Sequence, residues 1–83
     1  MADDSENHAH LSVGLAVRSI RERRKLTQED VAYESGLSLR HYQKIEAGTV
    51  DMRLSTLWRL ADVLEVAPHA LIERVETRAA KKG

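Results

Sequence analysis

The chain has 83 residues, with 13 basic and 13 acidic side chains and no cysteine. This length suits one small domain. The lack of cysteine excludes a disulfide scaffold, thiol chemistry and cysteine-based zinc sites. No apolar run approaches the roughly 20 residues that a membrane span needs, and the N-terminus has no signal-peptide pattern. The composition therefore favours a cytoplasmic protein with no membrane segment.

Charge is distributed unevenly along the chain, although the formal net charge is zero. Asp3, Asp4 and Glu6 lie in a polar stretch, and we expect residues 1–10 to form a disordered arm. Without these three residues, 13 basic residues face 10 acidic ones. The basic residues cluster in two runs: Arg18, Arg21, Arg23, Arg24 and Lys25, then Arg78, Lys81 and Lys82. Charge alone does not separate a nucleic-acid-binding surface from an ordinary solvated helix face.

Two helices are predicted in the first half of the chain. Apolar residues recur with a helical period over about residues 12–25, at Val13, Val17 and Ile20. Thr27 is a good N-cap for the second helix, with Asp30 at the position where a capping box prefers Glu. Gly36 ends this helix, because glycine accepts the left-handed conformation without penalty.

Three more helices follow the same pattern of start and stop signals. Ser38 caps a third helix over 38–47, and Gly48 ends it. The fourth helix is expected to begin at Arg53, a weak cap, although Ser55 is the better cap chemically. Pro68 stands at the first position of a fifth helix. Its apolar stripe comprises Leu71, Ile72, Val75 and Ala79.

The connections between these helices are short, and no strand is predicted. The expected fold is therefore all-α, a compact five-helix orthogonal bundle over residues 11–80, followed by a basic tail over 81–83. The link at residues 36–38 is too tight for antiparallel packing of the two helices that it joins. It predicts a helix-turn-helix, in which the second helix points outward.

The outward face of the third helix suits contact with the major groove of DNA. It comprises Leu39, Arg40, His41, Gln43 and Lys44. Arg and Lys pair with guanine O6 and N7, and Gln pairs with adenine N6 and N7. Any soluble helix has polar residues outside, so the glycine-centred turn is the more specific signal.

The sequence resembles the Cro and phage-repressor type of helix-turn-helix domain, also called the xenobiotic-response-element family, whose fold is lambda-repressor-like. The resemblance covers about residues 13–72. It rests on six segments: Arg18–Arg21, Leu26–Ala32, Gly36–Ser38, Ile45–Gly48, Leu57–Ala61 and Leu64–Val66. It implies a sequence-specific transcriptional regulator that binds double-stranded DNA.

The resemblance also implies roles for particular residues. Gln28 is expected to bind a phosphate, and Arg21 and Glu46 to form a structural ion pair. The full set expected to contact DNA is Gln28, Ser38, Leu39, Arg40, His41, Gln43, Lys44 and Thr49. The sequence departs from the family pattern at Met52 and Arg53, at Glu65 where glycine is usual, and at Leu39, which cannot hydrogen-bond a base.

A homodimer on a palindromic operator is expected, because one recognition helix reads about half of a typical site. The expected interface is Leu71, Ile72 and Val75, unless this stripe only closes the core. Trp58 is a further candidate. A phage-type repressor, a restriction–modification controller and an antitoxin-type autoregulator all remain open as roles.

Two other classes of function are hypotheses with less support in the sequence. An antitoxin-like module that mainly binds a partner protein is the alternative function. An enzyme is not expected, because the sequence has no catalytic triad, phosphate-binding loop or evident carboxylate pair. No catalytic residue, metal site, cofactor or small-molecule ligand is predicted, and the scattered histidines are expected to be solvated: His8, His10, His41 and His69.

Overall fold

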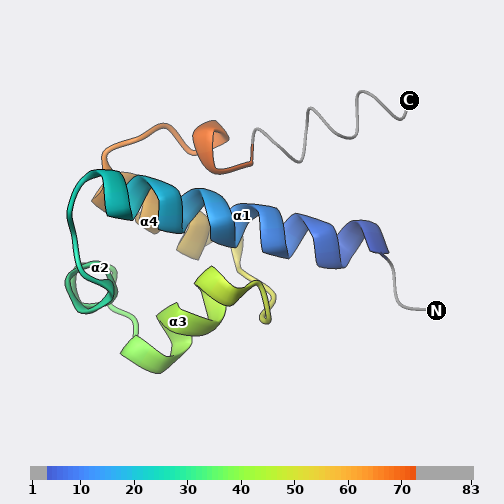
Figure 1. Cartoon of the computed structure of the whole chain (residues 1–83), viewed down its shortest axis with the longest axis horizontal. Coiled ribbons are helices and arrows are strands. Elements are labelled where there is room, and N and C mark those ends of the chain that lie inside the picture. Colours follow the sequence, from blue (N-terminus) through green and yellow to red (C-terminus); the bar gives the residue numbers. More distant parts are fainter. Residues whose placement is uncertain (1–3, 73–83) are drawn as a thin grey trace.

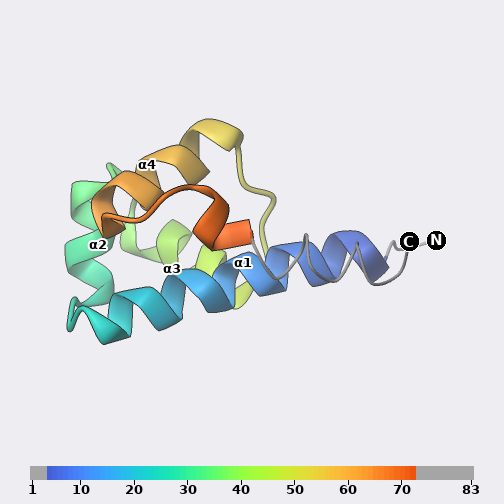
Figure 2. The same cartoon turned by 90° about the horizontal axis from the view of Figure 1, so that it is seen from above.

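In a computed structural model that describes residues 4–72, with side chains from residue 9 onward, the chain is helical with no strand. The helices are α1 (Asp4–Arg23), α2 (Gln28–Glu34), α3 (Leu39–Ala47) and α4 (Leu54–Leu64). A further helical turn spans residues 69–72. The long α1 crosses α3 and α4 (Figure 1), and the 69–72 turn lies between α1 and α4 in the second view (Figure 2). The prediction of an all-α helix-turn-helix fold is confirmed.

The first helix begins earlier than the sequence indicated, at Asp4 instead of near residue 12. The expected disordered arm is therefore wrong for residues 4–10, while residues 1–3 and the predicted tail at 81–83 lie outside the described part. Tertiary contacts support the extra turns, because His10 Nε2 lies 3.3 Å from Asp51 Oδ1 after α3. Ala9 and His10 also line a small hollow with Val50. Such contacts leave no periodic signal in the sequence.

Side-chain caps start α2 and α3 at the predicted residues. The Thr27 hydroxyl accepts from the Asp30 N–H, and the Thr27 N–H donates to Asp30 Oδ2, both at 3.0 Å. This is a complete capping box with Asp in place of Glu. The Ser38 hydroxyl accepts from the His41 N–H at 3.1 Å. Arg53 precedes α4 without a side-chain cap, as expected.

Each of the four helices is followed by a left-handed residue, and two of these residues, Lys25 after α1 and Glu65 after α4, are not glycine. Gly36 and Gly48 have φ of +70° and +72°. Glu65 has φ of +58° after α4, at the position where the family usually has glycine. A non-glycine residue there costs roughly 1–2 kcal/mol. Arg24 supports this end, because its Nη1 donates to Leu64 O at 2.5 Å and its Nη2 to Glu65 Oε2 at 3.1 Å.

The core draws apolar side chains from all four helices and from the 69–72 turn. Its buried members are Val17, Ile20, Val31, Ala32, Tyr42, Ile45, Leu60, Ala61, Leu64 and Leu71. Leu71 is only 1% exposed. Its prediction as a dimer-interface residue is therefore wrong, because it closes the core of its own chain. Ile72 is half-buried, and Val75 lies outside the described residues.

The backbones of α1 and α3 approach each other closely at Gly14. A Cβ atom built there would lie 2.5 Å from the carbonyl oxygens of both Ile45 and Glu46. Backbone oxygens cannot move aside as a flexible side chain can, so this crossing requires glycine. The sequence signal was available, since an isolated glycine inside a helical pattern commonly has a packing reason.

We predict that Gly14→Ala destabilises the protein. Alanine is the better helix former by about 1 kcal/mol, but the clash with two carbonyl groups is expected to exceed this gain. The free energy of unfolding should fall by about 1–3 kcal/mol, measured by urea denaturation followed by circular dichroism. Ser19→Ala, at an exposed position of α1, is the matched control. Equal stability of the two variants would contradict the close crossing.

Candidate nucleic-acid interface

The face of α3 that is predicted to contact DNA, called the reading face below, is exposed to solvent. Leu39, Arg40, His41, Gln43 and Lys44 are all exposed, and the opposite face of the helix is buried. The Ser38 hydroxyl, also expected at the DNA, serves as the cap of α3. Thr49 is exposed just beyond the helix, and its hydroxyl donates to Lys44 O at 3.3 Å. The structure thus places the expected α3 residues and Thr49 on one continuous segment.

The turn between α2 and α3 is anchored from α4. The carbonyl oxygen of Ser35, the last residue before Gly36, accepts a hydrogen bond from Arg59 Nη1 at 3.1 Å. Apolar contacts add to this anchor, because Val31, Ala32 and Tyr42 all enter the core. The angle between α2 and α3 is therefore set by tertiary contacts as well as by the tight turn.

A buried ion pair joins α1 to α3, as the resemblance implied for Arg21 and Glu46. Arg21 Nε lies 2.6 Å from Glu46 Oε2, and Arg21 Nη2 lies 3.3 Å from Glu46 Oε1. Arg21 Nη1 also donates to Leu26 O at 2.9 Å, which ties in the loop before α2. The residues are only 9% and 7% exposed. The pair is therefore shielded from water and makes several specific hydrogen bonds.

Burial and hydrogen bonding act in opposite directions on the Glu46 carboxyl. Burial raises its pKa, but hydrogen bonds from Arg21, Tyr42 and Gln28 lower it more, so the net pKa lies below the ordinary value. The Tyr42 pKa is raised strongly by burial and by its bond to Glu46. Its phenol therefore stays neutral and donates to Glu46 Oε2. Glu46 is an ionised group that only accepts hydrogen bonds at neutral pH.

Two glutamines extend this buried pair to the surface. Gln28 Nε2 donates to Glu46 Oε1 at 3.0 Å, and Gln43 Nε2 donates to Gln28 Oε1 at 3.1 Å. Gln28 was expected at a phosphate and Gln43 near the bases, but the sequence did not predict that they bind each other. They lie on different helices, 15 positions apart. The Tyr42–Glu46 contact did have a signal, since the two residues are four apart on one helix.

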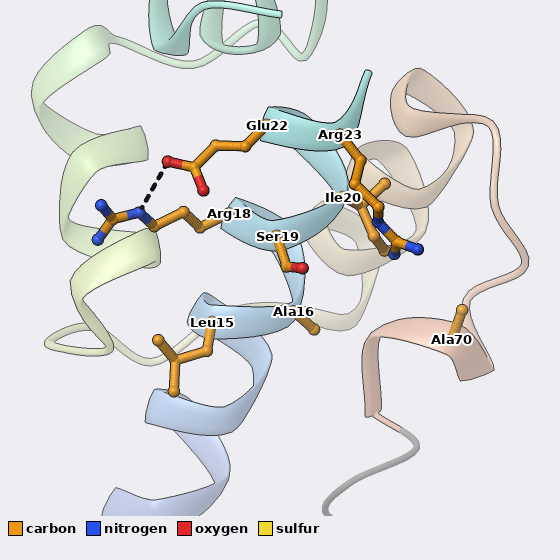
Figure 3. A pocket seen from close by; sticks show the side chains of 8 residues that line it. All are labelled: Leu15, Ala16, Arg18, Ser19, Ile20, Glu22, Arg23 and Ala70. Atoms are coloured by element: carbon orange, nitrogen blue, oxygen red, sulfur yellow. Dashed lines mark hydrogen bonds and ion pairs between the residues drawn. The ribbon is translucent and has the colours of Figure 1, made fainter. Parts of the chain in front are cut away.

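A groove lies between α1 and the 69–72 turn, apart from the exposed face of α3. Figure 3 shows its lining: Leu15, Ala16, Arg18, Ser19, Ile20, Glu22, Arg23 and Ala70. Arg18 Nε donates to Glu22 Oε2 at 3.3 Å, so these two charges are directed to each other. The Ala70 side lies away from α3 in this view. This groove is therefore separate from the reading face.

The described residues contain neither a cluster of metal-ligating side chains nor a membrane-spanning helix. Among them, no three His, Asp or Glu side chains come together as a possible metal site. His41 is on the reading face, His10 is beside Asp51, and His69 is in the last helical turn. No helix within residues 4–72 is long and apolar enough to cross a membrane.

A short capped helix, a glycine turn and an outward helix with basic and amide side chains define the helix-turn-helix class of DNA-binding proteins. The sequence itself matches the HTH_3 (helix-turn-helix) family model over residues 17–71. The chain therefore belongs to this family of XRE/Cro-type transcriptional regulators. No curated protein matches the sequence.

Solved structures share the fold. The restriction–modification controller protein C.AhdI from Aeromonas hydrophila is 30% identical, with a TM-score of 0.71, over 74% of this chain and 92% of that chain. The clp gene regulator ClgR from C. glutamicum is 18% identical, with a TM-score of 0.78, over 84% of this chain and 91% of that chain. The wild-type controller C.Esp1396I is 24% identical, with a TM-score of 0.73, over 96% and 99% of the two chains. The last two likenesses concern the fold alone.

We predict that Glu46→Ala destabilises the fold strongly, because it removes the close partner of the buried Arg21 charge and leaves only the exposed Glu22 carboxylate, 3.9 Å away. The expected loss is on the order of 3 kcal/mol, which lowers the melting temperature by roughly 10 °C or more in a domain of this size. Glu34→Ala is the control, since it removes an exposed carboxylate of α2 that does not contact the Arg21–Glu46 pair, and such a surface change is worth at most about 0.5 kcal/mol. An unchanged melting curve for Glu46→Ala would contradict the structural role of the pair.

The same measurement at acid pH checks the charge state of Glu46. Its folded pKa lies below its unfolded value, so its charged form stabilises the fold above the unfolded pKa. This contribution is lost as the pH falls through the folded pKa. The difference between wild type and Glu46→Ala should therefore shrink in acid.

Proposed function

We propose that the protein is a sequence-specific transcriptional regulator that binds palindromic operators as a homodimer, with α3 in the major groove. The supporting observation is the orientation of α3. Arg40 and Lys44 are exposed one helical turn apart, and neither side chain is hydrogen-bonded within residues 9–72. Both are free to bind DNA, while the other face of α3 is held by the core and by Glu46.

The exposed side chains support distinct roles on DNA. Arg40 is near the N-terminal end of α3, which enters the groove most deeply in this motif. Its planar fork matches guanine O6 and N7. Lys44 reaches a second base or a flanking phosphate, and Leu39 packs on a thymine methyl. His41 and Ser38 flank this face.

Phosphate contacts complete the proposed interface. Gln28 is the first residue of α2, where the positive end of the helix favours an anion. One N–H of its amide is bonded to Glu46, and the other is available for a phosphate oxygen. Thr49 lies beyond α3, beside the next phosphates. These groups set the position of α3 on the duplex and carry no sequence information themselves.

The likeness to C.AhdI favours one of the three regulatory roles. That protein is a restriction–modification controller, and the match covers 92% of it at 30% identity. We propose the same role for this protein, acting in the cytoplasm without a cofactor or catalytic residue. Mapping the sites bound in cells tests this proposal. Bound promoters beside restriction and methylation genes would support it, and promoters of toxin or phage genes would contradict it.

We predict that Arg40→Ala relaxes preference at one base pair. Sites selected from random duplex DNA by wild type should show a guanine preference that the variant loses, at a cost of about 1–3 kcal/mol per half-site. Affinity of both proteins should fall steeply with salt, because bound phosphates release counterions. Identical preferences in the two proteins would contradict base reading by Arg40. No binding to any duplex at low salt would contradict the function.

The proposed dimer is supported by an apolar surface on α4. Leu54 and Trp58 are 69% and 58% exposed and stand one turn apart on this helix. Two large apolar side chains exposed together commonly mark an interface. A second copy covering this face of α4 would remove both side chains from water. This moves the interface from Leu71, which is buried, to α4.

We predict that Trp58→Lys produces monomers. Sedimentation of wild type at micromolar concentration should show about twice the 9.4 kDa mass of one chain. The variant should sediment as a single chain and bind a palindromic operator more weakly than wild type. Tyr33→Lys is the matched control, because Tyr33 is an exposed aromatic residue on α2. Dimers that persist in Trp58→Lys would contradict the α4 interface.

A further inference from the structure

A series of hydrogen bonds runs from Glu46 through Gln28 on α2 to Gln43 on the exposed side of α3, and it has a defined direction. Glu46 lies at its inner end, Gln28 in the middle and Gln43 at the exposed end. From this arrangement we propose that Glu46, acting through Gln28, orients the Gln43 amide and thereby makes Gln43 specific for adenine. The proposal rests on the DNA-binding function proposed above.

The first step is the acceptor-only character of Glu46. Its Oε2 accepts from Arg21 Nε and from the Tyr42 hydroxyl, and its Oε1 accepts from Arg21 Nη2 and Gln28 Nε2. Four hydrogen bonds use the whole accepting capacity of a carboxylate. An ionised carboxylate has no proton to donate, so Gln28 must direct its NH₂ group to Glu46. The opposite orientation of the Gln28 amide would set two oxygens against each other.

The second step transmits this orientation across the helix-turn-helix. With its NH₂ group held by Glu46, Gln28 directs its carbonyl oxygen to Gln43. A carbonyl oxygen accepts and does not donate, so Gln43 must direct its own NH₂ group to Gln28. Gln43 then keeps its carbonyl oxygen and one N–H free. In this way the buried charge of Glu46 decides which amide groups the exposed Gln43 presents.

The free groups of Gln43 match adenine. Adenine offers an N6 donor and an N7 acceptor in the major groove, and an amide pairs with them through one oxygen and one N–H. If the Gln28 amide were also turned, so that its NH₂ group faced Gln43, the Gln43 oxygen would accept from Gln28 and Gln43 would direct its NH₂ group to the DNA. Those groups match guanine, which offers the acceptors N7 and O6. The orientation of the Gln43 amide therefore decides whether Gln43 prefers adenine or guanine.

Gln28 is a positioning residue in this scheme. Its effect on base preference can be measured separately from its effect on overall affinity for DNA. Replacing it with methionine keeps a long unbranched side chain but removes both the donor to Glu46 and the acceptor for Gln43. The Gln43 amide is then free to turn. The variant also loses the proposed phosphate contact of Gln28, but a phosphate contact weakens binding to all sequences alike. The ratio between sites differing at one base pair isolates the positioning role.

The test compares wild type, Gln28→Met, Gln43→Met and Thr49→Val on DNA selected from random duplexes. Wild type should prefer adenine to guanine at one position per half-site by about 10-fold or more, and both glutamine variants should retain about twofold or less. Thr49→Val is the matched control, because it alters a proposed phosphate contact outside the glutamine chain. It should weaken binding without changing the preference.

The solution structure without DNA supplies an independent readout. In the nuclear magnetic resonance spectrum of the free protein, the side-chain NH₂ signals of Gln43 should shift in Gln28→Met and stay in place in Thr49→Val. Unmoved signals in Gln28→Met would overturn the proposal, as would an adenine preference that this variant keeps. If no variant and no wild-type protein selects DNA, the proposed function is contradicted, and the spectra still decide whether Gln28 orients Gln43.

Discussion

The buried ion pair between Arg21 and Glu46 is the interaction on which the arrangement of the other elements depends. Two opposite charges are removed from water, and this is tolerable only because hydrogen bonds satisfy both of them. The partners come from the end of α1, the loop before α2, the first residue of α2 and the buried face of α3. Four parts of the chain must therefore adopt their native positions together before the pair is stable.

The pair depends in turn on the close crossing of α1 and α3. Gly14 lets the two backbones meet at the last turn of α3, and Arg21 reaches the same helix two turns further along α1. Since Tyr42 and Ile45 of α3 are also buried in the core, α3 cannot rotate without breaking these contacts. A rigid α3 presents its exposed side chains in a fixed orientation, which lowers the entropy lost when DNA binds.

Two other parts of the molecule depart from the usual preferences of amino-acid residues, one in backbone conformation and one in burial. Glu65 adopts a left-handed conformation that favours glycine, and Arg24 offsets part of the cost with hydrogen bonds to Leu64 and Glu65. Leu54 and Trp58 stay exposed on α4, although their burial would stabilise the protein. The cost at Glu65 is offset by a residue of the same chain. The exposure of Leu54 and Trp58 fits the proposed contact with another copy.

Local chemistry in the sequence determined the starts and ends of α2 and α3, the glycine turn and the exposed face of α3. Caps, glycines and helical periodicity act within a few residues, so they are readable without a structure. The Arg21–Glu46 pair was accessible only through family resemblance. Tertiary structure alone decided the early start of α1, which part of α3 Gly14 meets, the burial of Leu71 and the bond between Gln28 and Gln43. Each of these features depends on groups far apart in the chain, and no local pattern specifies which distant partner a side chain will meet.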